Sequence, residues 1–567
     1  MNHSRWNLLP PVPDKNLVNA SGFPPLIVQL LYNRGLSEPQ QLKSFITADK
    51  SLSSDPFLLS DMHQAVARIY QALLSGEKIA VYGDYDADGI TATALLVQGL
   101  STLGSKATPY IPHRLTEGYG LKKAALENLH QQGISLVITV DCGITSLPEV
   151  EKAKRMGLDV IITDHHTPLS EMPAAVAVVD PKLPDSAYPF SELAGVGVAL
   201  KLLQALFQSL GKEKYLEKLM DLAALGTIAD VSPLIGENRY LVKEGLKLMN
   251  SAPRLGVKEI ITQTGLDTGS LDAESVSWVI APRLNAAGRL GHAMASYKLL
   301  MTDSPQEAYQ LAKWLEQKNT ERQKLTVTNL AKAREQVLAT GISPLLVAGD
   351  KDYPIGIAGL VAGRLSEEFY RPAIVIKTGE KISSGSCRSI PEFNIIAALN
   401  QCHNLLSYFG GHSQAAGFTL PTRNLAKVKQ ILSELATAQL AEADLRPCLN
   451  IDALVTLPEM AGDTFQIAQQ LAPFGRGNPL PAFLSRGVEV IDCRTMGNNN
   501  GHLRLKLRQG GTMWDGVAFG SGKYQAEVVS PLDIVYNLEI DRWRGKEQLR
   551  LNIQDFAPSK QGGKTNE

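Results

Sequence analysis

The chain is poor in cysteine and has no long apolar segment. Its five cysteines are scattered and form no C-x-x-C pair, which argues against a disulfide framework and a zinc knuckle. No apolar run reaches the roughly 18 residues of a membrane span, and residues 1–15 lack the apolar core of a signal peptide. These absences predict a reduced, cytoplasmic protein that is neither exported nor embedded in a membrane.

Neither sign of charge is in excess. The 567 residues carry a formal net charge of -1, so any nucleic-acid surface must come from a local concentration of cations. Hydrophobic residues make up 44% and charged residues 20%, as in ordinary globular proteins. The length is too great for one hydrophobic core and predicts about two to four domains.

The motifs of several common enzyme classes are missing. GGKT near the C-terminus lacks the earlier glycine of a phosphate-binding loop, and GSGK is followed by Tyr524 instead of serine or threonine. No nucleophile elbow of the Ser-His-Asp hydrolases occurs. A nicotinamide-binding domain is disfavoured, because the first predicted strand ends in acids that would repel a pyrophosphate.

The sequence does contain three acidic motifs, each directly after a short apolar run. GDYDADG (83–89), DCG (141–143) and DHH (164–166) follow the predicted strands KIAVY, LVITV and DVIIT. The carboxyl ends of the strands in an open α/β sheet form the crevice where ligands bind, so these side chains should converge. Carboxylates at that density repel one another unless cations hold them, which predicts a metal site.

Strand and helix patterns alternate in the first half of the chain, which predicts an α/β fold on a mostly parallel sheet. Ser304 and Pro305 begin a long helical pattern that Gly341 ends, and short alternating runs near the C-terminus predict a small β-barrel or sandwich. The expected parts are an N-terminal lead-in at 1–60, a catalytic α/β domain at 61–302, a connecting helix at 303–341, a second α/β domain at 342–445, a β-barrel at 446–558 and a disordered tail at 559–567.

The spacing of the acids suits divalent cations. Asp86 and Asp88 can face the same way in an extended loop, and Asp141, at the end of the second strand, is the natural bridging ligand. His165 would add a nitrogen ligand, which favours manganese, with magnesium as the alternative. Asp230 in TIADV is a further candidate acid. Each acid alone could instead cap a helix or a turn, but their joint position at one sheet edge favours metal binding.

In order along the chain, GDYDADG, DCG, DHH and TIADV resemble the motifs of the DHH phosphoesterase superfamily. RLNAAGRLGHA, SGSCRS and GGHSQAAG resemble its RecJ branch, the bacterial single-strand-specific 5′ to 3′ exonucleases. The resemblance covers nearly the whole chain. It implies a DHH-type catalytic domain, a second α/β domain, an oligonucleotide-binding (OB)-like barrel, and hydrolysis of phosphodiester bonds in DNA repair and recombination.

The resemblance also implies roles for single residues. His166 would lie beside the scissile phosphate, or would only orient His165, and Asp84 would be an additional acid near the metals. Some superfamily members have a histidine ligand where this chain has Tyr82, so the first metal position is expected to bind its ion more weakly. The implied ligands of two manganese or magnesium ions are Asp86, Asp88, Asp141, His165 and Asp230.

Three later segments carry groups that bind phosphate. RLNAAGRLGHA presents its arginines in what is predicted to be a glycine-broken loop, and SGSCRS adds hydroxyls beside an arginine. Each segment alone could equally be a surface loop with an ordinary salt bridge, and the histidine of GGHSQAAG could be a core residue. The residues expected to bind the 5′-phosphate or the DNA are Arg283, Arg289, Ser384, Ser386, Arg388 and His412.

The strand HLRLKLR (502–508) alternates strictly, which places Arg504, Lys506 and Arg508 on one face and three leucines on the other. Together with Arg542 and Trp543, these cations predict a groove for single strands, because OB barrels combine basic grooves with stacking aromatics. The alternative is a solvated basic face without a ligand.

Three functions compete. An exonuclease for the 5′ ends of single-stranded DNA is favoured. A DHH phosphodiesterase for short oligoribonucleotides or cyclic dinucleotides would need neither barrel nor long helix, and a metal-free DNA-binding scaffold would not need the acids. The resemblance also implies a single-strand-binding protein and a helicase as partners, a monomeric enzyme, and no membrane association.

Overall fold

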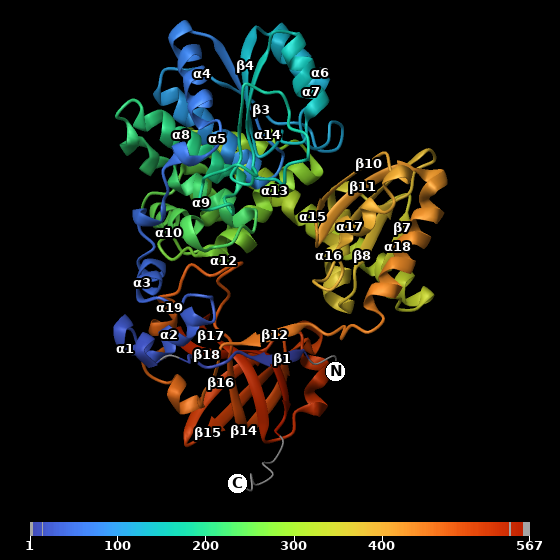
Figure 1. The fold of residues 1–567 in the computed structure, drawn as a ribbon. Helices are drawn as coiled ribbons and strands as arrows, with labels where there is room; N and C mark the ends of the chain where they lie inside the picture. The colour runs from blue at the N-terminus through green and yellow to red at the C-terminus, as the bar shows by residue number, and fades with distance from the viewer. Residues whose placement is uncertain (1–3, 14, 544–545, 560–567) are drawn as a thin grey trace. The chain divides into compact units, whose positions relative to one another are not determined.

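The computed structural model describes residues 4–13, 15–543 and 546–559 and forms two compact units (Figure 1). One unit is Lys50–Leu445, and the other combines Met1–Asp49 with Arg446–Glu567. The segment expected as a separate lead-in therefore divides between the two units. Apart from Ser559, the tail expected to be disordered lies outside the described residues.

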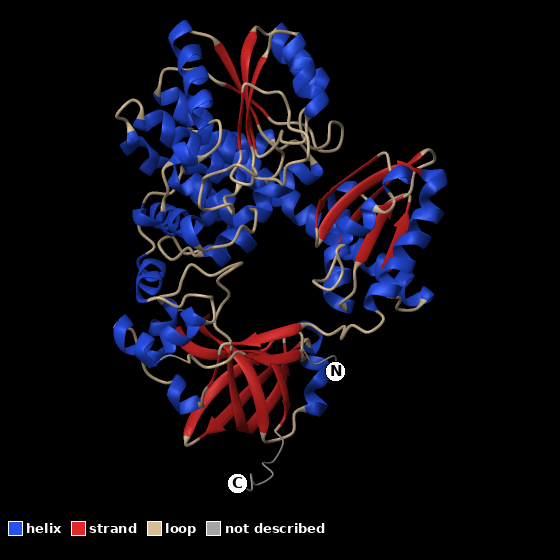
Figure 2. Ribbon diagram, viewed as in Figure 1, coloured by secondary structure: helices blue, strands red, loops and turns tan. Residues whose placement is uncertain are grey.

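A five-stranded parallel sheet carries the acidic motifs. KIAVY, LVITV and DVIIT lie in β2, β4 and β5 and are neighbours in the sheet, whose order is β3-β2-β4-β5-β6. Both faces are covered by helices (Figure 2), which explains why these strands are apolar throughout. The strands are β2 (Lys78–Tyr82), β3 (Thr108–Tyr110), β4 (Ile134–Val140), β5 (Asp159–Thr163) and β6 (Ala177–Val179).

On one face of the sheet, α4, α5 and α8 contact the strands and share a core with Ile79 and Val81, and α9 to α14 extend this core. On the other face, α6 and α7 share a smaller core with Ala80 and Tyr82. The helices are α4 (Met62–Ser75), α5 (Ala87–Thr102), α6 (Lys123–Gln131), α7 (Leu147–Arg155), α8 (Gly195–Gln208), α9 (Met220–Ala229), α10 (Gly236–Ser251), α11 (Leu255–Thr264), α12 (Ala273–Ser275), α13 (Ala281–Leu290) and α14 (Met294–Met301).

The long predicted helix is α15 (Pro305–Thr340), with Ser304 as its N-cap. The Ser304 side chain accepts a hydrogen bond from the N–H of Glu307, as the sequence predicts. Its first half buries Ala308, Ala312 and Leu315 in the core of the parallel-sheet region, and its second half buries Ala333 and Val337 against the next sheet. The connecting helix thus also contributes side chains to two hydrophobic cores.

A second, mixed sheet follows α15, in the order β10-β11-β9-β8-β7. SGSCRS, expected to be a loop, forms most of the strand β9, which pairs antiparallel with both β8 and β11. The elements are β7 (Leu346–Asp350), α16 (Ile355–Phe369), β8 (Ala373–Lys377), β9 (Ile382–Arg388), α17 (Ile395–Asn400), β10 (Tyr408–His412), β11 (Ala415–Pro421) and α18 (Leu425–Leu440).

The other unit contains the predicted barrel. Its six strands follow the order β13-β14-β15-β16-β18-β17, and β14 also pairs with β17, which closes the sheet. A short parallel pair joins β1 (Arg5–Leu8) to β12 (Cys448–Ile451). The strands are β13 (Ala453–Leu454), β14 (Phe483–Met496), β15 (His502–Gln509), β16 (Thr512–Ala518), β17 (Leu532–Trp543) and β18 (Lys546–Pro558), and the helices are α1 (Lys15–Ser21), α2 (Pro25–Tyr32), α3 (Pro39–Thr47) and α19 (Thr464–Gln469).

Among the described residues, none of the helices is both long and apolar enough to cross a membrane. All five cysteines are free thiols.

Candidate metal centre and adjoining arginine cluster

The acids of GDYDADG lie in the turn from β2 into α5. Asp86 caps this helix, because its side chain accepts hydrogen bonds from the N–H groups of Asp88 (3.0 Å) and Gly89 (3.1 Å). Asp88 accepts from the N–H groups of Gly195 (2.7 Å) and Val196 (2.9 Å) at the start of α8. Two helix N-termini therefore face these carboxylates, where the helix dipole favours negative charge.

Asp141 and Asp230 bring in acids from two other elements. Asp141 directly follows β4 with φ 60°, a left-handed conformation that is costly for a residue other than glycine. Gly195 leaves space for it, because a Cβ there would lie 2.5 Å from the Cβ of Asp141. Asp230 ends α9, and its carboxylate accepts a hydrogen bond from Ser232 Oγ (2.6 Å).

All seven residues predicted around the metals come together. Their possible ligand atoms form three groups, each within 4.8 Å: Asp88, His165 and Asp230; Asp84, Asp86 and Asp141; and Asp141, His165 and His166. Asp141 belongs to two of these groups, as a bridging residue would.

These carboxylates need a counter-charge. Asp84, Asp88 and Asp141 are buried, and Oδ1 of Asp84 has no hydrogen-bond partner among the described residues. Burial raises the pKa of all three carboxyls well above the usual value, and repulsion from neighbouring carboxylates raises it further. A divalent cation would remove this penalty, and several carboxylates with one imidazole suit manganese or magnesium. The residues present therefore fit the predicted metals.

His165 is oriented as a metal ligand. Its Nδ1 lies 3.1 Å from the carbonyl oxygen of Leu193, so Nδ1 carries the proton and Nε2 presents its lone pair. Nε2 lies 3.1 Å from Oδ1 of Asp141 and 4.0 Å from Oδ2 of Asp88. Burial, with the neighbouring His166, lowers the pKa of His165 to about 4, which keeps the ring neutral near pH 7.

The ring of His166 is held by the carboxylate of Asp164. Nδ1 lies 2.7 Å from Oδ1 of Asp164 and 3.1 Å from the hydroxyl of Tyr119. Burial, the largest single effect, would lower the pKa of His166, but the charge and hydrogen bond of Asp164 and the charges of Asp230 and Asp84 together outweigh it and raise the pKa to about 9. The ring of His412 stacks on His166 at 6.0 Å between centroids, which brings β10 of the second sheet to this site. The ring of His166 also meets the ring of His165 edge to face, with 4.5 Å between the centroids.

Tyr82 takes no part in the cluster. Its hydroxyl donates a hydrogen bond to the carbonyl oxygen of Gly120 (3.2 Å), and its ring stacks on Tyr110.

RLNAAGRLGHA is mostly helix, contrary to the loop predicted from its glycines. It lies mainly in α13, and Gly288 is needed for packing instead of a turn, since a Cβ there would lie 2.4 Å from the carbonyl oxygen of Tyr85. The two arginines of this helix differ. Arg283 pairs with Glu316 of α15 (2.5 Å), whereas Arg289 donates to the carbonyl oxygen of Gly356 (3.1 Å).

Arg289 lies in a cluster of like charges. Its pKa is lowered to about 9, first by burial and then by the charges of Arg114, Arg322 and Arg388. Arg114 also lies over the ring of Tyr85, with 4.8 Å between the guanidinium carbon and the centroid. Arg114, Arg289 and Arg388 therefore lie close to one another and near the loop that carries the acids.

Ser386 and Arg388 lie together, as predicted. A Cβ on Gly359 of α16 would approach Ser386 Oγ to 2.9 Å and Arg388 Nη2 to 3.0 Å, so both groups lie against this glycine. Ser384 instead exchanges a hydrogen bond with Thr419 (3.2 Å) on the neighbouring strand.

The sequence-based prediction missed Arg114 and Arg322. Arg114 follows β3, which lies beside β2, so the convergence of parallel strand ends would have pointed to it had the short run TPY been recognised as a strand. Arg322 had no such signal, because it is one of many cations along α15.

The predicted basic face of the barrel is mixed in charge. In β15 the leucines are buried, and Arg504, Lys506 and Arg508 are exposed, as the alternation predicts. However, Arg508 pairs with Glu489 (2.6 Å), Arg504 lies 3.8 Å from Asp515, and Lys506 lies opposite Asp492 and Asp515 in the strand register. The face is therefore largely compensated by acids. The side chains of Arg542 and Trp543 lie outside the described residues.

Three family models match the chain. They are the DHH family, N-terminal domain (residues 78–227), the DHHA1 domain (338–438) and the RecJ OB domain (451–555). The predicted domain boundaries themselves stay predictions.

Several curated proteins named single-stranded-DNA-specific exonuclease RecJ are similar to the chain. The Bacillus subtilis protein is 39% identical, with 98% of this chain and 71% of the relative covered. The Escherichia coli protein is 32% identical, with 94% and 96% covered. The crystal structure of RecJ in complex with Mn²⁺ from Thermus thermophilus superposes with a TM-score of 0.84 at 32% identity, covering 98% of this chain and 80% of that one. The Mg²⁺ complex from the same organism gives 0.78 at 30% identity, covering 98% and 79%.

Proposed function

The chain belongs to the RecJ family of single-stranded-DNA-specific exonucleases, and from this premise we propose that it hydrolyses phosphodiester bonds of single-stranded DNA from the 5′ end with the help of divalent metal ions. The observation that carries the proposal is the proximity of two clusters of opposite charge. The buried acids could hold cations at the bond to be cleaved, and the arginines beside them could hold a terminal phosphate.

The side chains divide into two ligand sets that share Asp141. Asp88, His165 and Asp230 would hold one ion and Asp86 a second, with Asp141 shared by both and Asp84 beside them. When bound, manganese or magnesium would supply a water nucleophile at neutral pH and neutralise charge on the phosphate oxygens. We propose that the site holds two ions and not one, and that manganese is preferred over magnesium.

His166 and Asp164 would act on the scissile phosphate. Asp164 fixes the proton on Nδ1 of His166 and thereby sets the ring orientation. Nε2 would then donate a hydrogen bond to a phosphate oxygen, or its proton to the leaving oxygen. His412, stacked on His166, would approach the same strand from the second sheet.

The arginine cluster would give the reaction its direction. Arg289, Arg388 and Arg114, with Ser386, offer guanidinium and hydroxyl donors that fit the two negative charges of a terminal phosphate better than the single charge of an internal one. A strand held there by its 5′-phosphate would place its first phosphodiester bonds near the acids. Arg283 and Ser384, which bond within the protein, would have lesser roles.

Two alternatives are less well supported. A phosphodiesterase for short oligoribonucleotides or cyclic dinucleotides would not need the OB domain that the family model matches. A metal-free scaffold would keep buried like charges without a cation to balance them. We also propose a role in DNA repair and recombination, a monomeric state, a cytoplasmic setting, which the five free thiols suit, and, from the family alone, a single-strand-binding protein and a helicase as partners.

One experiment tests polarity, strand state and metal dependence together. The protein is incubated with 5′-labelled and 3′-labelled single strands and with duplex, with manganese or with chelator. We expect immediate release of short 5′-labelled products from single strands, only with the metal. Early release of short products from the 3′ label would contradict the proposed direction.

A further inference from the structure

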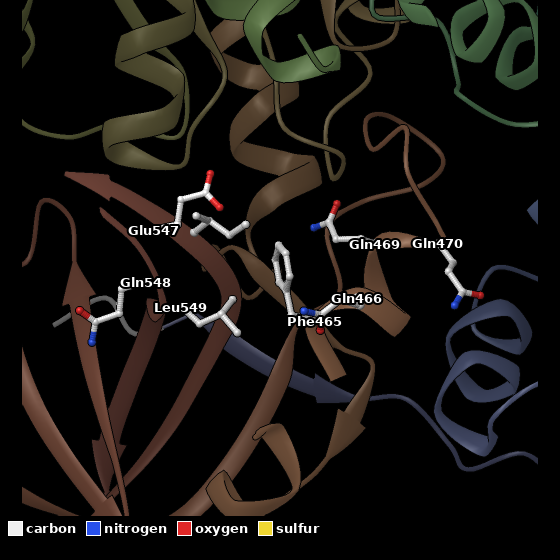
Figure 3. Close-up of a pocket in the computed structure, with 8 residues that line it drawn as sticks. Phe465, Gln466, Gln469, Gln470, Glu547, Gln548 and Leu549 are labelled. Carbon is white, nitrogen blue, oxygen red and sulfur yellow. The ribbon is translucent and has the colours of Figure 1, made fainter. Parts of the chain in front are cut away.

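A cleft of about 660 Å³ lies in the unit that contains the barrel, between α19 and the strands β17 and β18 (Figure 3). In Figure 3 the ring of Phe465 stands between the strand residues Glu547 and Leu549 on one side and the helix residues Gln466 and Gln469 on the other. The residues that line the cleft are Phe465, Gln466, Gln469, Gln470, Ile540, Glu547, Gln548 and Leu549.

The chemistry of the lining suits a flat, neutral, hydrogen-bonding ligand. Phe465, Ile540 and Leu549 provide an apolar wall with one aromatic face. The amides of Gln466 and Gln469 provide donors and acceptors, and Glu547 adds an acceptor. Among the described residues the lining includes no cation, which favours a neutral ligand over a phosphate. Nucleobases combine a stacking face with edges that glutamine and glutamate recognise, because glutamine pairs with adenine and a carboxylate accepts from the amino group of cytosine.

The position of the cleft points to the same ligand. When the two-residue strand β13 is set aside, β14, β15, β16, β17 and β18 are the first to fifth strands of the barrel along the chain, so β17 and β18 enclose its last loop. In OB folds the loop between the fourth and fifth strands is one of the places where oligonucleotides bind. Glu547, Gln548 and Leu549 lie within the first residues of β18 after that loop.

We propose that this cleft binds one base of the single-stranded DNA substrate, with the base stacked on Phe465 and its edge bonded to Gln466, Gln469 and Glu547. The inference rests on the proposed function, which supplies the ligand. The sugar and phosphates of that nucleotide stay outside the cleft.

The test is an abasic scan with the full chain. Binding of 5′-phosphorylated single strands is measured by fluorescence anisotropy in the presence of a chelator, which prevents digestion. One abasic nucleotide is moved stepwise along a strand of adenines. We expect the affinity to fall at one position, or two adjacent positions, by about fivefold to a hundredfold, the range for one stacked base.

Variants assign that position to the cleft. Phe465→Ala and Gln469→Leu should bind the intact strand about as weakly as the parent protein binds the strand with the critical base removed. In these variants, removal of that base should cause no additional loss of affinity. The slope of log affinity against log salt should be unchanged, because no phosphate contact is lost. Gln466→Leu should also weaken binding, whereas Gln554→Leu, exposed on β18 outside the cleft, should not. A melting curve of each variant checks the fold, and Gln469→Leu serves if Phe465→Ala unfolds.

Three results would overturn the inference. They are an affinity that does not depend on the abasic position, a position dependence that survives in both Phe465→Ala and Gln469→Leu, or a variant that changes the salt slope. Normal hydrolysis from the 5′ end combined with any of these would reject the base site alone. Absence of single-strand binding by the parent protein would reject the proposed function as well.

Discussion

Gly288 packs directly on the backbone of Tyr85: a Cβ at Gly288 would lie 2.4 Å from the Tyr85 carbonyl oxygen. A second residue of the same helix reinforces the contact, because Asn285 accepts a hydrogen bond from the N–H of Ala87 (2.9 Å). The loop that this contact fixes contains Asp84 and Asp86, and the next residue of the helix is Arg289. One helix therefore positions both the acidic loop and an arginine of the proposed phosphate site.

Gly288→Ala should therefore damage the reaction without removing any ligand. The added methyl must push the helix and the loop apart, which we expect to cost about 1 to 3 kcal/mol of stability. Hydrolysis should fall by roughly tenfold to a hundredfold, since a misplacement of about 1 Å has effects of that size. Gly363→Ala is the control: it is also helical, but its Cβ would meet only Arg388 Cγ, at 3.8 Å. Equal activity in the two variants would show that the close contact is unimportant.

Asp141→Asn should abolish hydrolysis and make the metal-free protein more stable. Removing one of several buried like charges relieves repulsion that no cation balances in chelator. The parent should gain about 2.7 kcal/mol when manganese is at one hundred times its dissociation constant, and the variant much less. Melting temperatures with chelator and with manganese measure both effects, and Asp185→Asn, on an exposed carboxyl, is the control. A variant that keeps the full manganese-dependent gain would remove Asp141 from the ligand set.

Arg388→Ala should erase the preference for 5′-phosphorylated over 5′-hydroxyl strands. A charge-assisted hydrogen bond of this kind contributes about 1.5 to 3 kcal/mol, or roughly tenfold to a hundredfold in rate at low substrate. Initial rates on the two substrates give the ratio. Arg364→Ala, an exposed arginine of α16 paired with Glu367, should keep the parental ratio. If Arg388→Ala keeps it too, the role would pass to Arg114 or Arg289.

Replacing Arg504, Lys506 and Arg508 together by alanine should reduce the salt dependence of DNA binding. The reduction should be smaller than the loss of three uncompensated cations would cause. The log affinity versus log salt slope for a single strand should flatten by about 0.7, one contact, instead of about 2, because Arg504 and Arg508 are already compensated by acids. Lys506→Ala alone should reproduce the change. A flattening near 2 would show that DNA displaces the acids, and an unchanged slope would leave this face without a role in binding.

The metal cluster could be predicted from the sequence because it depends on a simple rule. Asp86, Asp141 and His165 each follow a strand of one parallel sheet, and such strand ends meet at one edge whatever the details of packing. The same rule would have reached Arg114 if its short strand had been recognised.

The features that the sequence did not predict depend on contacts between distant segments of the chain. The glycine of α13 looked like a turn residue because its partner, the Tyr85 carbonyl, is about 200 residues away in the sequence. The compensation of Arg508 by Glu489 depends on which residues face each other across two strands, and the alternation of one strand does not contain that register. Packing and pairing of this kind follow from the fold and not from local pattern.

The parallel pair between β1 and β12 has a consequence for biosynthesis. Arg5–Leu8 is synthesised before Cys448–Ile451, the strand with which it pairs, and the whole unit Lys50–Leu445 lies between them. At about 5 to 20 residues per second, β1 waits roughly 20 to 90 s for its partner, while the unit between them can fold. During that time β1 has an unpaired edge, to which a chaperone could bind.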